Sequence, residues 1–170
     1  TAYHALDSVT ASTTNLIRVR YGATQATATI AVYAASTADS STSTLSATFT
    51  GQAATDTTSP FNIPVATKSA VVKLTALTSG SSAVAGIPIA FTVSYSGNYS
   101  AGDVSPSSTT VTTVFTDSSG VATLTVTNNN PVSGAVAVVT ATGFASGTTS
   151  GTKSITLNWL KSQAKTVTVT

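Results

Sequence analysis

The sequence predicts an all-β protein, an antiparallel β-sandwich of about ten strands, and three observations support that prediction. Among the 170 residues, 36 are Thr and 25 are Ser, and the β-branched Thr and Val favour strands. Glu and Met, which lose little side-chain freedom in a helix, are absent from the chain. Apolar and polar residues alternate along most of the chain, which places successive side chains on opposite faces of a sheet.

Each predicted strand is one run of this alternation. The first run has Ile17, Val19 and Tyr21 on one face and Arg18 and Arg20 on the other. In chain order the runs cover residues 17–21, 26–32, 45–49, 72–76, 87–95, 122–126, 136–141, 155–159 and 167–169. Turn-forming residues separate them, among them the Ser/Thr tract 36–44, Ser79-Gly80-Ser81, Gly97-Asn98, Asp117-Ser118-Ser119-Gly120 and the run 128–131. Short strands at this spacing are typical of an antiparallel sandwich.

The chain is long enough for one large or two small domains without disulfide support. Pro60 and Pro64 bracket Phe61-Asn62-Ile63, and this weak boundary predicts an N-terminal β region over residues 1–65 and a sandwich over residues 66–170. A chain that begins at Thr1 predicts a processed protein, most simply one that has lost a secretory signal peptide. We therefore expect a secreted, cell-surface or extracellular location.

Charge and hydropathy exclude two classes of partner at this stage. The net charge is +2, and the seven cations are spread from Arg18 to Lys165 without the cluster that nucleic acid needs. The longest apolar run, residues 135–139, is far shorter than the roughly 18–20 residues that span a bilayer. The expectation is no nucleic-acid partner and no membrane span.

Between residues 69 and about 145, four short stretches match the sequence pattern of a known kind of domain. They are Val72-Lys73-Leu74-Thr75-Ala76, the stretch from Val84 to Phe91, Ser105-Pro106-Ser107, and Thr116-Asp117-Ser118-Ser119-Gly120-Val121-Ala122-Thr123-Leu124. In the last stretch Asp can cap its own turn, Gly can take a positive φ, and Ala fits where strands approach closely. Together these stretches resemble the bacterial immunoglobulin-like domain of the intimin and invasin surface proteins.

The resemblance implies an immunoglobulin-like β-sandwich that serves as a surface spacer, adhesin or assembly unit, with no catalytic residues. Two departures stand out: Ala83 occupies a position where the family usually has Pro, and Pro88 falls inside a strand, where only an edge or bulge tolerates it. Residues 1–65 and 146–170 lie outside the resemblance, and they either form a second β domain or extend the sandwich.

The residues that carry enzyme chemistry are scarce, so we expect a non-enzymatic protein without cofactors. His4 is the only histidine, no Gly-x-Ser-x-Gly elbow occurs, and the five Asp residues are widely separated and suit turns. One His and no Cys offer no transition-metal site. A structural calcium held by loop carbonyls and one or two Asp residues stays open as an alternative.

Two modifications are suggested by short motifs. Asn98-Tyr99-Ser100 is an N-glycosylation sequon in a Gly/Ser setting, although an ordinary turn explains it equally well. Lys73, the run Asn128-Asn129-Asn130 and Asp117 could together form a Lys–Asn isopeptide crosslink.

The two ends of the chain suggest how copies could associate. Residues 1–14 precede the first predicted strand, and residues 166–170 alternate Thr and Val. An extended terminal segment can complete its own sheet or add to the open edge of another. The leading hypothesis is a structural subunit of a pilus-like filament, or of a surface layer, in which copies of the chain join by strand exchange. The proposed donor positions are Ala2, His4, Leu6, Ser8 and Thr10.

Two alternatives remain at this stage. In the first, both termini pair within their own chain. In the second, the protein is a monomeric adhesin or carbohydrate-binding module that contacts a host surface or a glycan. Tyr95, Tyr99 and Trp159 are the aromatic candidates for that contact, and core packing explains each of them as well.

Overall fold

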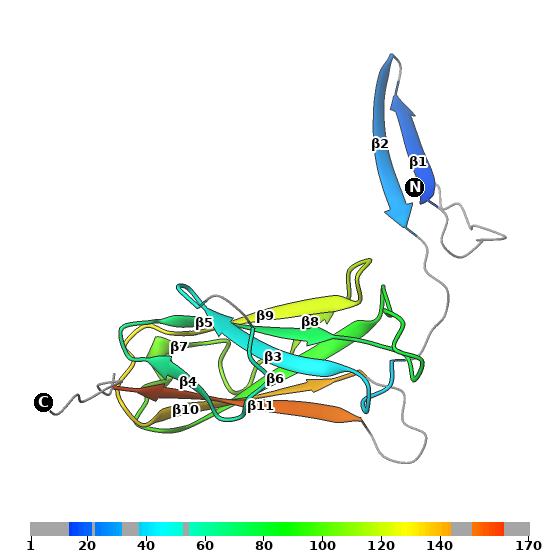
Figure 1. Cartoon of the computed structure of the whole chain (residues 1–170). Helices are drawn as coiled ribbons and strands as arrows, with labels where there is room; N and C mark the ends of the chain where they lie inside the picture. The colour runs from blue at the N-terminus through cyan, green and yellow to red at the C-terminus, as the bar shows by residue number, and fades with distance from the viewer. Residues whose placement is uncertain (1–13, 22, 32–37, 53–54, 144–150, 162–170) are drawn as a thin grey trace, which may run out of the picture. The chain divides into compact units, whose positions relative to one another are not determined.

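The structure, a computed structural model, describes residues 14–21, 23–31, 38–52, 55–143 and 151–161. It is all-β, and the chain divides into two compact units, Thr1–Ser36 and Thr37–Thr170. In the first unit, β1 (Thr14–Tyr21) and β2 (Thr24–Ala31) form an antiparallel hairpin whose register runs from Thr14↔Ala31 to Tyr21↔Thr24. These two strands make a sheet of their own (Figure 1).

The second unit is a β-sandwich of two sheets (Figure 1). The five-stranded sheet has the order β4 (Phe61–Pro64), β11 (Thr152–Leu160), β10 (Ala135–Thr142), β6 (Pro88–Gly97) and β8 (Thr112–Phe115). The four-stranded sheet has the order β3 (Thr44–Phe49), β5 (Ser69–Thr75), β9 (Val121–Asn128) and β7 (Val104–Ser105). A 3-10 turn, η1 (Ala101–Asp103), precedes β7.

The hydrophobic core lies between these sheets because strict alternation gives each strand one apolar face. In β5, Ala70, Val72 and Leu74 are buried, while the residues between them are half-buried. In β11 the buried positions are Ile155, Leu157 and Trp159. The Trp159 indole is fully buried, and its Nε1 donates to the backbone oxygen of Thr67 at 3.0 Å, so its one polar atom is satisfied.

The turn between β8 and β9 follows the chemistry predicted for its motif, although it crosses from one sheet to the other and the two strands do not pair as a hairpin. The Asp117 Oδ1 accepts hydrogen bonds from the backbone N–H of Ser119 at 2.8 Å and of Val121 at 2.9 Å. Gly120 has a φ of +74°, and Ala122 is buried. All three expectations for this turn are confirmed.

Several features differ from the sequence prediction. Three short strands, β4, β7 and β8, were not predicted, and β4 pairs with β11 in parallel rather than antiparallel. Pro88 is the first residue of β6 rather than an interior one, so its missing N–H costs no interior ladder bond. Residues 167–169 lie outside the described residues.

The predicted division at residues 65/66 falls inside the second unit. The reason is that β3 and β4 precede this point yet belong to the two sandwich sheets, through pairing with β5 and with β11. Of the two options for the flanking segments, the strands at 44–64 and 152–160 extend the sandwich, and the hairpin β1–β2 lies in the separate N-terminal unit.

Candidate functional site

The first half of β11 has an open backbone edge. Its pairing with β4 runs only from Leu157↔Phe61 to Leu160↔Pro64, so among the described residues no strand pairs with positions 152–156 on this side. On this side the Thr156 N–H donates to the Ser59 Oγ at 3.0 Å. Because backbone groups of alternate residues point the same way along a strand, the N–H and C=O of Ser154 face this open edge.

A second open edge lies across from it on β3. Beyond β3 the described residues include one isolated bridge, between Ala47 and Asp56. Each of these residues donates its backbone N–H to the backbone oxygen of the other at 2.8 Å. By the same alternation the backbone groups of Leu45 face this outer side. Two edges, one from each sheet, therefore present backbone groups near each other.

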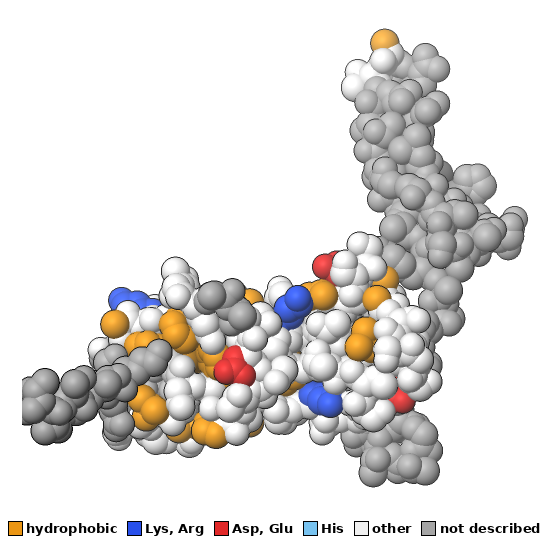
Figure 2. All heavy atoms as spheres, viewed as in Figure 1, with side chains coloured by type: hydrophobic (Ala, Val, Ile, Leu, Met, Phe, Trp, Pro, Cys, Tyr) orange, Lys and Arg blue, Asp and Glu red, His pale blue; other side chains and the backbone are white. Residues whose placement is uncertain are grey.

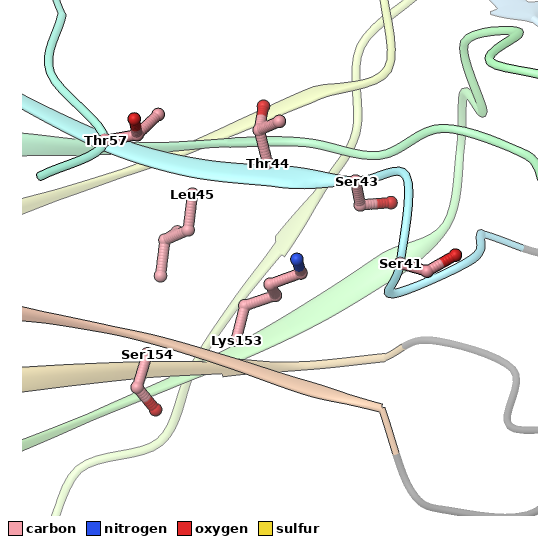
Figure 3. A pocket seen from close by; sticks show the side chains of 7 residues that line it. All are labelled: Ser41, Ser43, Thr44, Leu45, Thr57, Lys153 and Ser154. Atoms are coloured by element: carbon pink, nitrogen blue, oxygen red, sulfur yellow. The ribbon is translucent and has the colours of Figure 1, made fainter.

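Between these edges lies a groove with a volume of about 350 Å³. Its lining consists mostly of small hydroxyl side chains, with one apolar and one charged residue: Ser41, Ser43, Thr44, Leu45, Thr57, Lys153 and Ser154. Figure 3 shows the Lys153 side chain extending from β11 toward β3. We call this feature the β3–β11 groove.

Among the described residues that line the β3–β11 groove, Lys153 is the one that carries a charge. Nearby, the Asp39 carboxylate accepts hydrogen bonds from the Ser41 Oγ and N–H, both at 2.7 Å. These two bonds are the main reason that the pKa of Asp39 is lowered, and the Lys153 charge contributes least. The carboxylate is thus held by its own turn, and Lys153 is left facing a polar groove.

The surface around the groove carries few charges. Figure 2 shows isolated Lys and Asp side chains on a face made mainly of uncharged polar groups. The whole chain has only 7 % charged residues. Little electrostatic repulsion therefore opposes contact between two such surfaces.

The predicted donor positions Ala2, His4, Leu6, Ser8 and Thr10 lie outside the described residues. Asn98 is described and exposed, directly after Gly97 at the end of β6. Its Nδ2 donates to the backbone oxygen of Ser133 at 3.0 Å, and its N–H donates to the Gly134 oxygen at 3.1 Å. The sequon thus lies on an exposed loop with its backbone held.

The three aromatic candidates have different surroundings. Trp159 is 0 % exposed and belongs to the core, so it offers no surface to a ligand. Tyr95 is half-buried and donates from its hydroxyl to the Pro106 oxygen at 2.8 Å. Tyr99 is 38 % exposed, and its ring centroid lies 5.5 Å from that of Tyr95 at an interplanar angle of 32°.

The isopeptide hypothesis does not fit the strand register. Lys73 pairs across from Thr123, whereas Asn128 lies five positions further along β9. At about 3.4 Å per residue that separation is roughly 17 Å, well beyond the reach of a lysine side chain. Asp117, the proposed acid, is exposed in its turn rather than buried.

In the described part of the chain, no group of three or more His, Cys, Asp or Glu residues could hold a metal ion. No helix in that part is long and apolar enough to cross a membrane.

Comparison of the chain with protein-family models, with curated proteins and with solved structures finds no match in any of the three. Function is therefore inferred from the residues of this chain alone.

Sequence reasoning missed the β3–β11 groove, although one signal for it exists. In an alternating strand Lys153 lies on the same face as Ile155, Leu157 and Trp159, which point into the core. The strand therefore carries a charged residue on its inward face. Such a lysine at a strand end marks a place where the sandwich is open.

Proposed function

We propose that this protein is a non-enzymatic subunit of an extracellular filament or surface layer, and that its subunits join by strand exchange. The observation that supports this proposal best is that the strands of both sandwich sheets lie between Thr44 and Leu160. The N-terminal unit Thr1–Ser36 contributes no described strand to them and is compact by itself. In this proposal the N-terminal segment adds to a neighbouring copy instead.

The donor in this proposal is the segment from Ala2 to Thr10. Extended segments bind open sheet edges through ladder hydrogen bonds and through alternate side chains that enter pockets. A contact between the N-terminus of one copy and the sandwich of the next is head-to-tail, and a head-to-tail contact that does not close produces a filament.

The sandwich in this proposal is immunoglobulin-like, as the resemblance to intimin and invasin domains implies. The order β3-β5-β9-β7 supports it because it corresponds to the A-B-E-D sheet of that fold, and β11-β10-β6 corresponds to G-F-C. One feature departs from the pattern: β8 pairs with β6 yet follows β7 in the chain. Immunoglobulin-like sandwiches are common in cell-surface domains, which agrees with the proposed location.

The test is negative-stain electron microscopy of the purified chain, combined with gels of boiled and unboiled samples. We expect filaments or sheets, and a ladder of multimers that collapses only on strong heating, because strand-exchanged contacts dissociate slowly. Deletion of residues 1–14 should abolish assembly while circular dichroism still reports a folded sandwich. Assembly that survives this deletion would refute the donor role of the segment.

The extracellular location has its own test at Asn98. If the native protein passes through a compartment with N-glycosylation, mass spectrometry of the peptide that contains Asn98 should show added sugar mass, and Asn98→Gln should remove it. An unmodified Asn98 in protein from the native source would leave this residue as a turn former only.

The second candidate function is a monomeric adhesin or carbohydrate-binding module. Tyr99 favours it, because this exposed ring beside Tyr95 could stack on a sugar. Titration with a broad glycan panel tests it, with Tyr99→Ala as the variant that should lose binding. Polymerisation without any glycan binding would eliminate this candidate.

A further inference from the structure

We propose that the β3–β11 groove is the acceptor for the donor segment, residues 2–10, of a second copy of this chain. This inference rests on the proposed strand-exchange function and adds the site at which exchange takes place.

The first support is the pattern of backbone groups. The open stretch of β11, residues 152–156, presents the N–H and C=O of Ser154 to the groove side, and the β3 edge presents those of Leu45. An added strand gains ladder hydrogen bonds from such groups, which no strand pairs among the described residues. The open stretch of β11 has five residues and spans about 17 Å. The nine-residue donor reaches about 30 Å when extended, so it is long enough to cover this stretch.

The second support is the size and composition of the β3–β11 groove. Its volume of about 350 Å³ lies at the small end of the range of ligand sites, roughly 300–1,000 Å³. Small hydroxyl side chains line it, and Leu45, only 7 % exposed, provides one apolar contact. On one face of an extended donor, Ala5 and Val9 flank Asp7, so this face presents small apolar side chains to the lining and the carboxylate to Lys153.

The third support is charge, and it selects the occupant. Lys153 is the charged residue of the groove, and Asp7 is the one acidic residue in residues 1–13. The other terminal segment, residues 162–170, carries Lys165, which the Lys153 charge would repel. Charge complementarity therefore favours the N-terminal segment over the C-terminal one.

The opposite edge of the same sheet provides a matched control. Thr116, which directly follows β8, donates its backbone N–H to the Ile87 oxygen on the β6 side. Because backbone N–H groups alternate in direction along a strand, the N–H of Thr113, three residues earlier, faces away from β6. Thr113→Pro and Ser154→Pro each remove one outward N–H from an edge position, where proline is tolerated. Only Ser154→Pro removes a donor from the β3–β11 groove.

The experiment measures the assembled fraction of full-length variants by sedimentation and electron microscopy, with thermal unfolding as the check on folding. We expect Ser154→Pro to lower assembly about tenfold and Thr113→Pro to leave it unchanged. Lys153→Asp and Asp7→Lys should each weaken assembly about fivefold, and the double variant should restore it. Lys161→Asp, at an exposed lysine outside the groove, is the charge control.

Three results would overturn the proposal, and they differ from one another. If the unmodified chain stays monomeric, the proposed function fails together with the acceptor. If filaments form and Ser154→Pro and Lys153→Asp assemble as well as their controls, subunit assembly stands but the acceptor lies elsewhere. If Lys153→Asp increases assembly, Lys153 protects the edge against association instead of recruiting a donor.

Discussion

At the scale of single residues, the turn before β9 shows how closely one position can be constrained. Gly120 has a φ of +74°, and a Cβ at this position would lie 2.6 Å from the Ala76 oxygen. Two effects therefore exclude a side chain here, because the backbone conformation is strained for an L-residue and the space is occupied by backbone. Glycine is required at this position for both reasons.

Gly120→Ala should lower the free energy of unfolding by about 2–4 kcal/mol, measured by denaturant titration. The control is Gly102→Ala, where a Cβ would meet nothing within 4 Å. That variant should change stability by less than about 0.5 kcal/mol. Equal effects of the two substitutions would show that the close approach to Ala76 does not govern stability.

At the scale of elements, Tyr95 ties the end of β6 to the loop after β7 through its hydrogen bond to the Pro106 oxygen. Burial, assisted by the neighbouring Tyr99, raises the pKa of Tyr95 from 10.0 to about 12. The folded state thus binds the phenolic proton more tightly than the unfolded state does. The contribution of the protonated Tyr95 hydroxyl to the free energy of unfolding is complete below pH 10 and is lost as the pH rises toward 12.

The melting temperature of the native chain should therefore fall more steeply between pH 10 and 12 than that of Tyr95→Phe. Differential scanning calorimetry across this window is the measurement. At pH 7 the variant should lose only the modest stability of one hydrogen bond, about 1 kcal/mol. Parallel curves for the two proteins above pH 10 would contradict the role given to the Tyr95 proton.

The hairpin β1–β2 differs from every other strand pair because its sheet contains only two strands in the described part of the chain. A two-stranded hairpin is marginally stable in water by itself. In dilute, unassembled protein, the amides of β1 and β2 should exchange with deuterium faster than those of β10, which is paired on both sides by β11 and β6.

On assembly, the exchange of the β1 and β2 amides should slow if a neighbouring copy provides the missing support, and mass spectrometry of peptic fragments measures this change. Protection of the hairpin equal to that of β10 in the monomer would show that the hairpin already has its support within one chain.

At the scale of the whole molecule, the described residues of the sandwich form a hydrophobic core between its two sheets. Its buried apolar residues run from Ala38 to Trp159 and form a single cluster. Removal of residues 1–36 should therefore leave a folded sandwich whose melting temperature changes by about 3 °C or less. The same truncation should abolish assembly, because it removes the donor. Loss of cooperative unfolding would show that the N-terminal unit is part of the folding unit.

Much of this fold could be predicted from local patterns. The eight strands from β1 to β11 with clear alternation were predicted because burial of one sheet face forces a period of two on the sequence. The turn at Asp117 and Gly120 was predicted because its chemistry is contained within a few adjacent residues. Local signals also placed Asn98 in a loop.

The short strands escaped prediction because their pairing is not local. The residues Phe61-Asn62-Ile63 between Pro60 and Pro64 alternate over a run too short to predict a strand. Together with Pro64 they nevertheless pair with Leu157 and its neighbours, nearly a hundred residues later. The predicted boundary at residues 65/66 separates β3 and β4 from the sandwich for the same reason, since their partners β5 and β11 come later in the chain.

The sequence by itself therefore determined that the protein is all-β, which residues face inward in most strands of the sandwich, and that the chain carries few charges. The tertiary structure alone decided which edges stay unpaired and where two of them face each other, beside Leu45 and Ser154. The physical reason is that side-chain burial leaves a periodic mark within each strand, whereas an open edge is defined by the neighbour that a strand lacks.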